Sequence, residues 1–98
     1  MLSEMPKVIK VPKWVLPFGY GFTLYKLVFI REDSKDYEYV KQHELVHVEQ
    51  WTRIGFFKFP YLYIKELIKN GYINNIYEIE ARELGAKRSK NINVKDFL

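Results

Sequence analysis

Residues 35–54, KDYEYVKQHELVHVEQWTRI, form the stretch around which the rest of this 98-residue chain can be interpreted. Good N-cap residues precede it and Gly55 follows it, so the stretch is predicted to form one helix. It contains HELVH at positions 43–47, which fits the pattern HExxH. Positions i and i+4 lie on the same face of a helix, so both imidazoles can reach one metal ion with Glu44 beside them.

The motif predicts a zinc site. Neutral imidazole nitrogen binds Zn²⁺ at about 2.0–2.1 Å in a tetrahedral set, which leaves one position for water in a catalytic site. The chain has two histidines, and both are in the motif. On a helical wheel His47 and Glu44 share an arc with apolar residues, and a polar group in such a place needs a partner. A metal ion is one answer, and two core histidines in a hydrogen-bond network are the alternative.

A third ligand is expected from the predicted helix at Ile76 to Ser89. Ala81 and Gly85 form part of a small apolar arc that lets this helix approach another closely, and Glu78 borders that arc. Glu78 is therefore the carboxylate best placed to enter a site between two helices. Glu80 points to a different side, because residues i and i+2 do not share a face.

Two alternatives bear on this assignment. Glu78 three residues after Asn75 also resembles a capping box, with Asn74 or Asn75 as the N-cap. A third histidine shortly after the motif is excluded, because positions 50 and 53 are Gln and Arg. The candidate zinc ligands are His43, His47 and Glu78.

The remaining elements predict an α+β fold in one domain, residues 1–98: a small β-sheet from the N-terminal third, followed by three helices. Apolar and β-branched residues predict a strand at Val8 to Val11 and one or two strands within Phe22 to Arg31. Pro60 in a first turn and Gly71 after the end predict a second helix at Pro60 to Asn70. The apolar residues near position 15 are expected to dock on the domain.

Composition limits the cellular setting. The chain has no cysteine, which excludes disulfides and thiolate metal sites. Residues 1–13 lack the apolar core of a signal peptide, and no run of 18 apolar residues occurs, so a cytoplasmic protein is expected. The net charge of +4 permits binding to nucleic acid or anionic lipid. Dispersed lysines are typical of a solvated surface, so nucleic acid is not the expected partner. The mixture of aromatic residues and lysines in residues 56–69 is of a kind that can lie on a membrane surface.

The candidate zinc ligands, together with Glu44, indicate a hydrolytic reaction. A water on the fourth zinc position has its pKa lowered toward neutrality, Glu44 takes its proton as general base, and the resulting hydroxide attacks a carbonyl. Glu44 then passes the proton to a leaving amine, so hydrolysis of a peptide or protein substrate is the natural reaction. A strand within Phe22 to Ile30 would hold an extended peptide by strand addition. Tyr72 and Tyr77 lie near the third helix without an assigned role.

HELVH, the following Gln50 and Trp51, and the run YEIEAR at 77–82 resemble the gluzincin metallopeptidases. The size of the chain resembles the minigluzincins, which are similar to the stripped-down catalytic domains of integral-membrane zinc peptidases. The resemblance covers residues 20–89 and implies a zincin-like minimal catalytic domain.

The resemblance also implies individual roles. Glu78 matches the first Glu of an ExxA motif on a glutamate helix, with Ala81 as its small residue. Arg82 stands where many relatives have an Asp that orients a ligand histidine, which puts ligand orientation in question. Latency is implied as well, with residues 1–18 or the tail 90–98, which carries Asp96, covering the cleft. A non-catalytic zinc protein and a basic aromatic module binding anionic lipid or nucleic acid are the alternatives.

Overall fold

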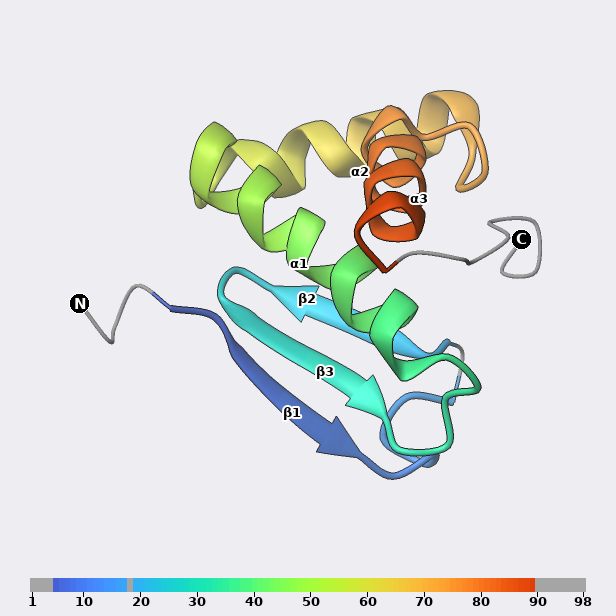
Figure 1. Ribbon diagram of the computed structural model, residues 1–98. Coiled ribbons are helices and arrows are strands. Elements are labelled where there is room, and N and C mark those ends of the chain that lie inside the picture. The colour runs from blue at the N-terminus through green and yellow to red at the C-terminus, as the bar shows by residue number, and fades with distance from the viewer. Residues whose placement is uncertain (1–4, 18, 90–98) are drawn as a thin grey trace.

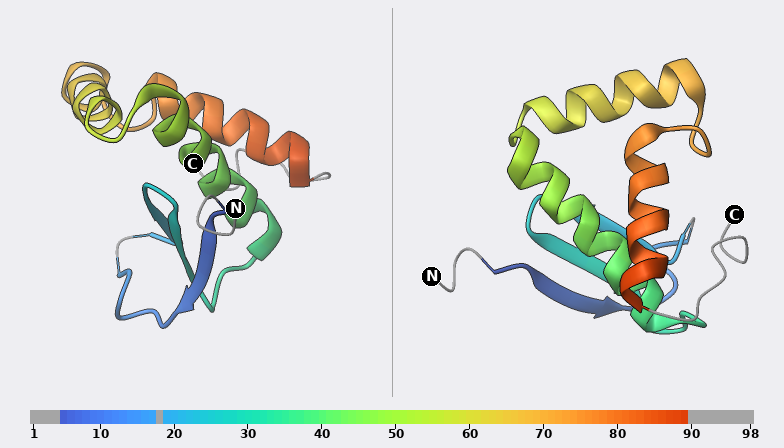
Figure 2. Two further views of the ribbon diagram at one scale, coloured as in Figure 1. Left: turned by 90° about the vertical axis from the view of Figure 1, so that its left-hand side faces the viewer. Right: turned by 45° about the horizontal axis from the view of Figure 1, so that its top comes forward.

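The computed structural model describes residues 5–17 and 19–89, and it consists of three strands followed by three helices (Figure 1). The α+β fold predicted from the sequence is confirmed. All three helices lie on one side of the sheet, and α2 lies farthest from it (Figures 1 and 2). The elements are β1 Lys7–Val11, β2 Gly21–Leu24, β3 Leu27–Arg31, α1 Tyr37–Ile54, α2 Lys58–Asn70 and α3 Ile76–Ser89.

The sheet has the order β1-β3-β2, so β3 is central. β2 and β3 pair antiparallel around a two-residue turn, in which Tyr25 has a φ of 56°. The Tyr25 ring packs against Trp51 and Phe56, which holds this left-handed residue in place. β1 pairs parallel with β3, with Val8 opposite Val28. β1 and β2 are therefore the two edges of the sheet.

The core lies between the sheet and α1. Alternate residues of β3, Val28 and Ile30, have no exposed surface and pack against α1. This follows from the two-residue period of a strand, which turns every second side chain to the same face. The core cluster consists of Val28, Ile30, Tyr39, Val40 and Val48. The motif helix is thus fixed directly on the sheet.

The helix ends follow the capping signals in the sequence. α1 starts at Tyr37, two residues after the predicted start, because the Asp36 side chain caps it by accepting the Tyr39 N–H at 3.0 Å. α2 starts at Lys58, two residues before Pro60, which still lies in the first turn, where its missing N–H has no cost. α3 has the predicted bounds, and Asn75 caps it through the Tyr77 N–H at 2.9 Å.

α3 packs closely on α1 through its small residues. Ala81 has no exposed surface, and a Cβ added to Gly85 would lie 3.0 Å from the His43 Cα atom. The predicted role of these two residues is confirmed. The close approach brings the backbone of α3 to the first histidine of the motif.

The segment between β1 and β2 docks only in part. Leu16 is buried, but the Trp14 side chain is 80% exposed, so the expectation that this whole apolar segment packs down is wrong for Trp14. The predicted covering segments fall partly on residues 1–4, 18 and 90–98, which lie outside the described residues. Among the helices that the structure describes, none is long and apolar enough to cross a membrane. The cytoplasmic location stays a prediction.

Candidate metal centre

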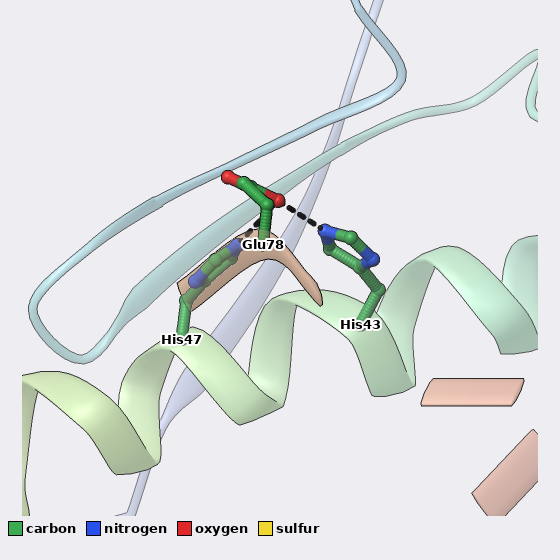
Figure 3. A group of neighbouring side chains, drawn as sticks. All are labelled: His43, His47 and Glu78. Atoms are coloured by element: carbon green, nitrogen blue, oxygen red, sulfur yellow. Dashed lines mark hydrogen bonds and ion pairs between the residues drawn. The ribbon is translucent and has the colours of Figure 1, made fainter. Parts of the chain in front are cut away.

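His43 and His47 from α1 and Glu78 from α3 converge on one point (Figure 3). The Nε2 atom of His43 lies 3.1 Å from Oε1 of Glu78, and that of His47 lies 3.2 Å from the same oxygen. One nitrogen or oxygen from each residue lies within 4.8 Å of the others. All three side chains are buried. The structure therefore brings the three predicted ligands together.

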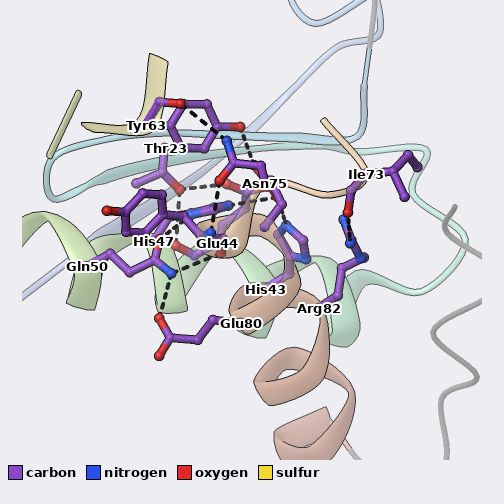
Figure 4. Close-up of polar contacts among 12 residues, drawn as sticks. Thr23, His43, Glu44, His47, Gln50, Tyr63, Ile73, Asn75, Glu80 and Arg82 are labelled. Atoms are coloured by element: carbon purple, nitrogen blue, oxygen red, sulfur yellow. Dashed lines mark hydrogen bonds and ion pairs between the residues drawn. The ribbon is translucent and has the colours of Figure 1, made fainter. Parts of the chain in front are cut away.

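Gln50 fixes the tautomer of His47. The Nε2 group of Gln50 donates to the Tyr77 carbonyl oxygen at 3.0 Å and to Oε1 of Glu80 at 2.7 Å, and both partners can only accept. The amide oxygen of Gln50 must therefore face His47, whose Nδ1 lies 2.8 Å away and has to carry a proton (Figure 4). In the neutral ring the lone pair then lies on Nε2, which points at Glu78.

This arrangement requires a positive charge between His47 and Glu78. With Nδ1 protonated, neutral His47 would turn a lone pair toward a carboxylate oxygen 3.2 Å away. Either a second proton or a cation resolves the conflict. Burial lowers the pKa of His47, but the hydrogen bond to Glu78 and the charges of Glu44 and Glu78 outweigh it and raise the pKa to about 9. Two imidazole nitrogens and one carboxylate oxygen suit Zn²⁺, so the donor set fits the metal.

Glu78 is held from two sides. Its Oε1 faces the two histidines, and its Oε2 accepts a hydrogen bond from the hydroxyl of Tyr63 on α2. Burial would raise the pKa of Glu78, but the hydrogen bonds from His43, His47 and Tyr63 lower it far below its usual range. The carboxylate is thus ionised and presents one oxygen to the two histidines, where a metal ion could bind. The alternative role of Glu78 in a capping box is not the one observed, because its carboxylate is turned toward His43, His47 and Tyr63.

Glu44 lies beside the candidate metal ligands and is closely packed against β2. The Thr23 hydroxyl on β2 donates to Oε1 of Glu44 at 2.7 Å, and the Glu44 side chain is buried. A Cβ at Gly21 would lie 2.8 Å from Oε2 of Glu44. The predicted general base is therefore held by an edge strand, and only glycine at position 21 leaves room for it.

Glu80 and Arg82 lie outside the ligand set. Glu80 binds Gln50 and, at 3.2 Å, the guanidinium of Arg53, which agrees with the prediction that it points elsewhere. Arg82 donates to the Ile73 carbonyl oxygen, in the turn before α3 (Figure 4). Gln50 instead orients His47. The Nδ1 atom of His43 lies 3.4 Å from the Tyr39 hydroxyl, a longer contact.

A cleft of about 510 Å³ opens over the site. β2 forms one wall and α2 the other, with Glu44, His47 and Glu78 at the base. Its residues are Gly19, Gly21, Phe22, Thr23, Leu24, Glu44, His47, Trp51, Phe59, Pro60, Tyr63, Ile64, Tyr72 and Glu78. No residue from 5 to 17 is among them, so the described part of the N-terminal segment does not line the cleft.

The wall formed by β2 is a free strand edge within the described residues. Arg31 of β3 donates its backbone N–H to the Tyr20 carbonyl oxygen at 2.9 Å, so the backbone carbonyl of Tyr20 points toward β3. Bonded and non-bonded pairs alternate along antiparallel strands. The backbone groups of Gly21 and Thr23 therefore face away from β3, next to Glu44.

Two tyrosines extend the site beyond what the sequence predicted. Tyr63 was not a candidate, and no local pattern marks it, because its contact with Glu78 depends on where α2 packs. Tyr72 had no assigned role and lines the cleft. Burial, together with the nearby charges of Glu78 and Glu44, raises the pKa of both phenols above the ordinary value. Both remain protonated and able to donate at neutral pH.

No protein-family model matches the sequence, and no curated protein and no solved structure matches it either. The function of the site therefore rests on its own geometry.

Proposed function

We propose that this protein is a minimal zinc metallopeptidase of the minigluzincin kind, with His43, His47 and Glu78 as metal ligands and Glu44 as general base. One observation carries the proposal. Two imidazole nitrogens and one carboxylate oxygen converge at the base of a cleft in which a further buried carboxylate, Glu44, lies beside a free strand edge.

Zinc supplies Lewis acidity in such a site, since it polarises a carbonyl oxygen and acidifies water. Glu44 then takes a proton from the water that attacks the carbonyl carbon of the substrate. When the C–N bond breaks, Glu44 returns this proton to the leaving amine. The hydrogen bond from Thr23 to Oε1 fixes the carboxylate of Glu44, so that it is oriented before the substrate arrives.

The substrate is proposed to be an extended peptide. The outward N–H and C=O groups of Gly21 and Thr23 can pair with such a chain as an added strand, which would lay a peptide bond across the metal position. Tyr72 lines the cleft as a protonated phenol and can donate a hydrogen bond to a substrate oxygen.

A non-catalytic zinc protein is the second candidate function. It is favoured by the same ligand set and by the depth of its burial, since closed structural sites are also buried. The two functions differ in what Glu44 does: a structural site makes no use of a general base.

Metal content tests the ligand set. After incubation with zinc and desalting, elemental analysis should find about one zinc per chain for the wild type and for Glu80→Ala. Glu78→Ala should bind zinc at least about 100-fold more weakly and therefore retain little of it. Glu80→Ala is the matched control, because it removes a carboxylate two residues away that lies outside the ligand set. Absence of zinc from the wild-type protein would refute the proposal.

Turnover tests the catalytic role. Zinc-loaded protein is incubated with a mixture of unstructured peptides, and new termini are identified by mass spectrometry. Glu44→Gln should keep its zinc and lose about 100-fold or more of the cleavage rate, because general-base catalysis contributes at least this factor. Equal rates for wild type and Glu44→Gln, with zinc bound in both, would establish the non-catalytic function.

Latency is also proposed, with residues 1–18 or residues 90–98 as the covering segment; residues 1–4, 18 and 90–98 lie outside the described residues. A chain ending at Ser89 should cleave peptides faster than the full chain. Deletion of residues 1–18 is a poorer test, because it also removes β1, which pairs with the central strand. Equal rates for the full and shortened chains would show that the tail does not restrain the enzyme.

A further inference from the structure

The outer side of α2 carries a row of exposed apolar side chains. We call the row Phe57, Tyr61, Ile64 and Ile68 the outer stripe; Phe57 is the N-cap and the other three lie within the helix. Steps of four, three and four residues place them along one side of the helix. Their exposed fractions are 83%, 66%, 54% and 81%, in the same order. These are high values for large apolar side chains that lie next to one another.

The opposite side of α2 makes the contacts with the domain. Phe59 is 3% exposed and packs against Trp51 of α1 and Tyr77 of α3, with ring centroids 5.3 and 5.4 Å apart. At about 100° per residue, Phe59 lies about 170° around the helix from the centre of the outer stripe. The stripe therefore faces away from α1 and α3.

A row of lysines runs beside the stripe. Lys58, Lys65 and Lys69 are exposed and lie about 90° around the helix from its centre. None of the ion pairs within the described residues includes them. Glu66, the one acid of the helix, lies on the far side of this row and accepts a hydrogen bond from Asn70. Apolar and cationic rows thus run parallel along one exposed side.

We propose that the outer stripe and its lysine row bind an anionic lipid surface, with α2 lying flat in the headgroup region. The helix is about 20 Å long, too short to span a bilayer, and the combination of a bulky apolar row with flanking lysines is the pattern of an interfacial helix. The stripe enters the acyl boundary while the lysines meet lipid phosphates. This binding does not depend on the metal site.

The chemistry of the stripe favours lipid over other partners. Nucleic acid is bound through phosphate contacts and base stacking on aromatic or Arg planes, whereas this stripe carries two isoleucines at its centre and end and no arginine. A second copy of the chain would bring the same lysines and the same net charge of +4 to the contact, which opposes self-association.

The placement has a consequence for the cleft. Ile64 belongs both to the outer stripe and to the cleft wall, so the cleft lies directly beside the stripe. A helix lying on a lipid surface would therefore hold the cleft next to that surface, where chains emerging from the membrane are concentrated.

Vesicle sedimentation tests the proposal on the full-length chain without added metal. The probes are vesicles of phosphatidylcholine alone and of phosphatidylcholine mixed with phosphatidylglycerol, each at low and high salt. The wild-type protein should sediment with the mixed vesicles at low salt, and its partitioning should fall at high salt and on neutral vesicles.

Two pairs of variants distinguish binding through the outer stripe and its lysine row from nonspecific apolar contact and from the effect of overall charge. Replacing the two most exposed stripe residues in Phe57→Ser/Ile68→Ser should weaken partitioning by about tenfold or more, whereas Trp14→Ser, which removes an 80% exposed aromatic remote from α2, should leave it unchanged. Lys65→Glu should weaken it by about tenfold, whereas Lys7→Glu on β1, with the same charge change, should have less than half that effect.

Three results would overturn the proposal. Failure of the wild type to sediment with anionic vesicles is the first. Equal effects of the α2 variants and their controls would assign the binding to overall charge. The third result comes from size-exclusion chromatography. If the wild type has the mass of two chains and the Phe57/Ile68 variant has the mass of one, a second copy covers the stripe. All of these outcomes are independent of zinc binding and of turnover.

Discussion

α1 makes two helix contacts of opposite character, one with α3 and one with α2. The contact with α3 is close, built on Ala81 and Gly85, and its buried polar groups all have defined partners except one nitrogen of Arg82. The contact with α2 depends on aromatic rings such as Phe59, and α2 leaves an apolar side exposed. The α1–α3 contact therefore sets the geometry of the candidate ligands, while α2 provides a wall of the cleft and one hydroxyl.

Gln50 of α1 donates hydrogen bonds to Tyr77 and Glu80 of α3, and its removal should have the largest effect among the residues that support the candidate ligands. Gln50→Leu keeps the volume but leaves His47 Nδ1 without its acceptor. We expect zinc affinity to fall by about 10–100-fold, the range for partners that orient ligand histidines. Competition with a chelating dye measures the affinity.

NMR of the histidine rings gives a second readout of the same variant. The wild type should show His47 with a proton on Nδ1, and Gln50→Leu should lose this preference. An unchanged tautomer together with unchanged zinc affinity would show that Gln50 does not orient His47.

Steric crowding of the α1–α3 contact is the next largest effect. Gly85→Val places a branched side chain against the backbone of His43, and overpacking of this kind costs about 1–3 kcal/mol of unfolding free energy. Lys87→Val adds the same side chain on the exposed side of α3 and should change the free energy by less than about 0.5 kcal/mol. Urea unfolding of both variants measures the difference, and equal values would contradict the close contact.

The pH dependence of the metal-free protein comes from the same contact. The raised pKa of His47, about 9, means that its stabilising charge is present below the ordinary value of 6.5 and is lost as pH rises through 9. The lowered pKa of Glu78 means that its contribution is present above 4.5 and is lost as pH falls below that value. The free energy of unfolding should therefore fall by about 2 kcal/mol as pH rises from 6.5 to 9.

Zinc should reverse this dependence, because the metal binds the neutral imidazole and displaces its proton. Thermal unfolding with and without zinc across this pH range measures both trends. A metal-free protein whose stability stays constant between neutral and alkaline pH would show that no charged His47–Glu78 pair forms.

α2 should contribute the smallest effect, through Tyr63. Tyr63→Phe removes the hydrogen bond to Oε2 of Glu78 and should weaken zinc binding about fivefold, near 1 kcal/mol. Tyr61→Phe on the outer side of the same helix is the control and should bind zinc like the wild type. A loss for Tyr63→Phe as large as that for Gln50→Leu would show that α2 supports the site as strongly as the α1–α3 contact does.

Much of the fold follows from local signals in the sequence. The caps at Asp36 and Asn75 and the break at Gly55 act within a few residues, so the bounds of α1 and α3 were predicted to within two residues. The parallel pairing of β1 was not predicted, because the pattern of a strand does not name its partner. The exposure of Trp14 was missed for a similar reason: apolar character does not show which surface is available to cover a side chain.

The convergence of the candidate ligands His43, His47 and Glu78 was also predictable, whereas the side chains that hold them in place were predictable only in part. Glu78 follows from helix periodicity and from the small residues beside it. Gln50 had a usable signal, since it lies three residues after His47 on the same helix and can reach the ring. Tyr63 had none, because fifteen residues and a change of direction separate it from Glu78. Side chains that depend on the packing of a second helix are not visible in a local pattern.

Gly21 has a consequence for how this sequence tolerates substitution. It lies on an edge strand and is partly exposed, a setting in which most residues are usually accepted. Its Cα hydrogen nevertheless faces Glu44, and the space there is smaller than a methyl group. In a saturation library scored for turnover, position 21 should accept glycine alone, like a fully enclosed core position, whereas a library scored only for folding should tolerate alanine at the same position.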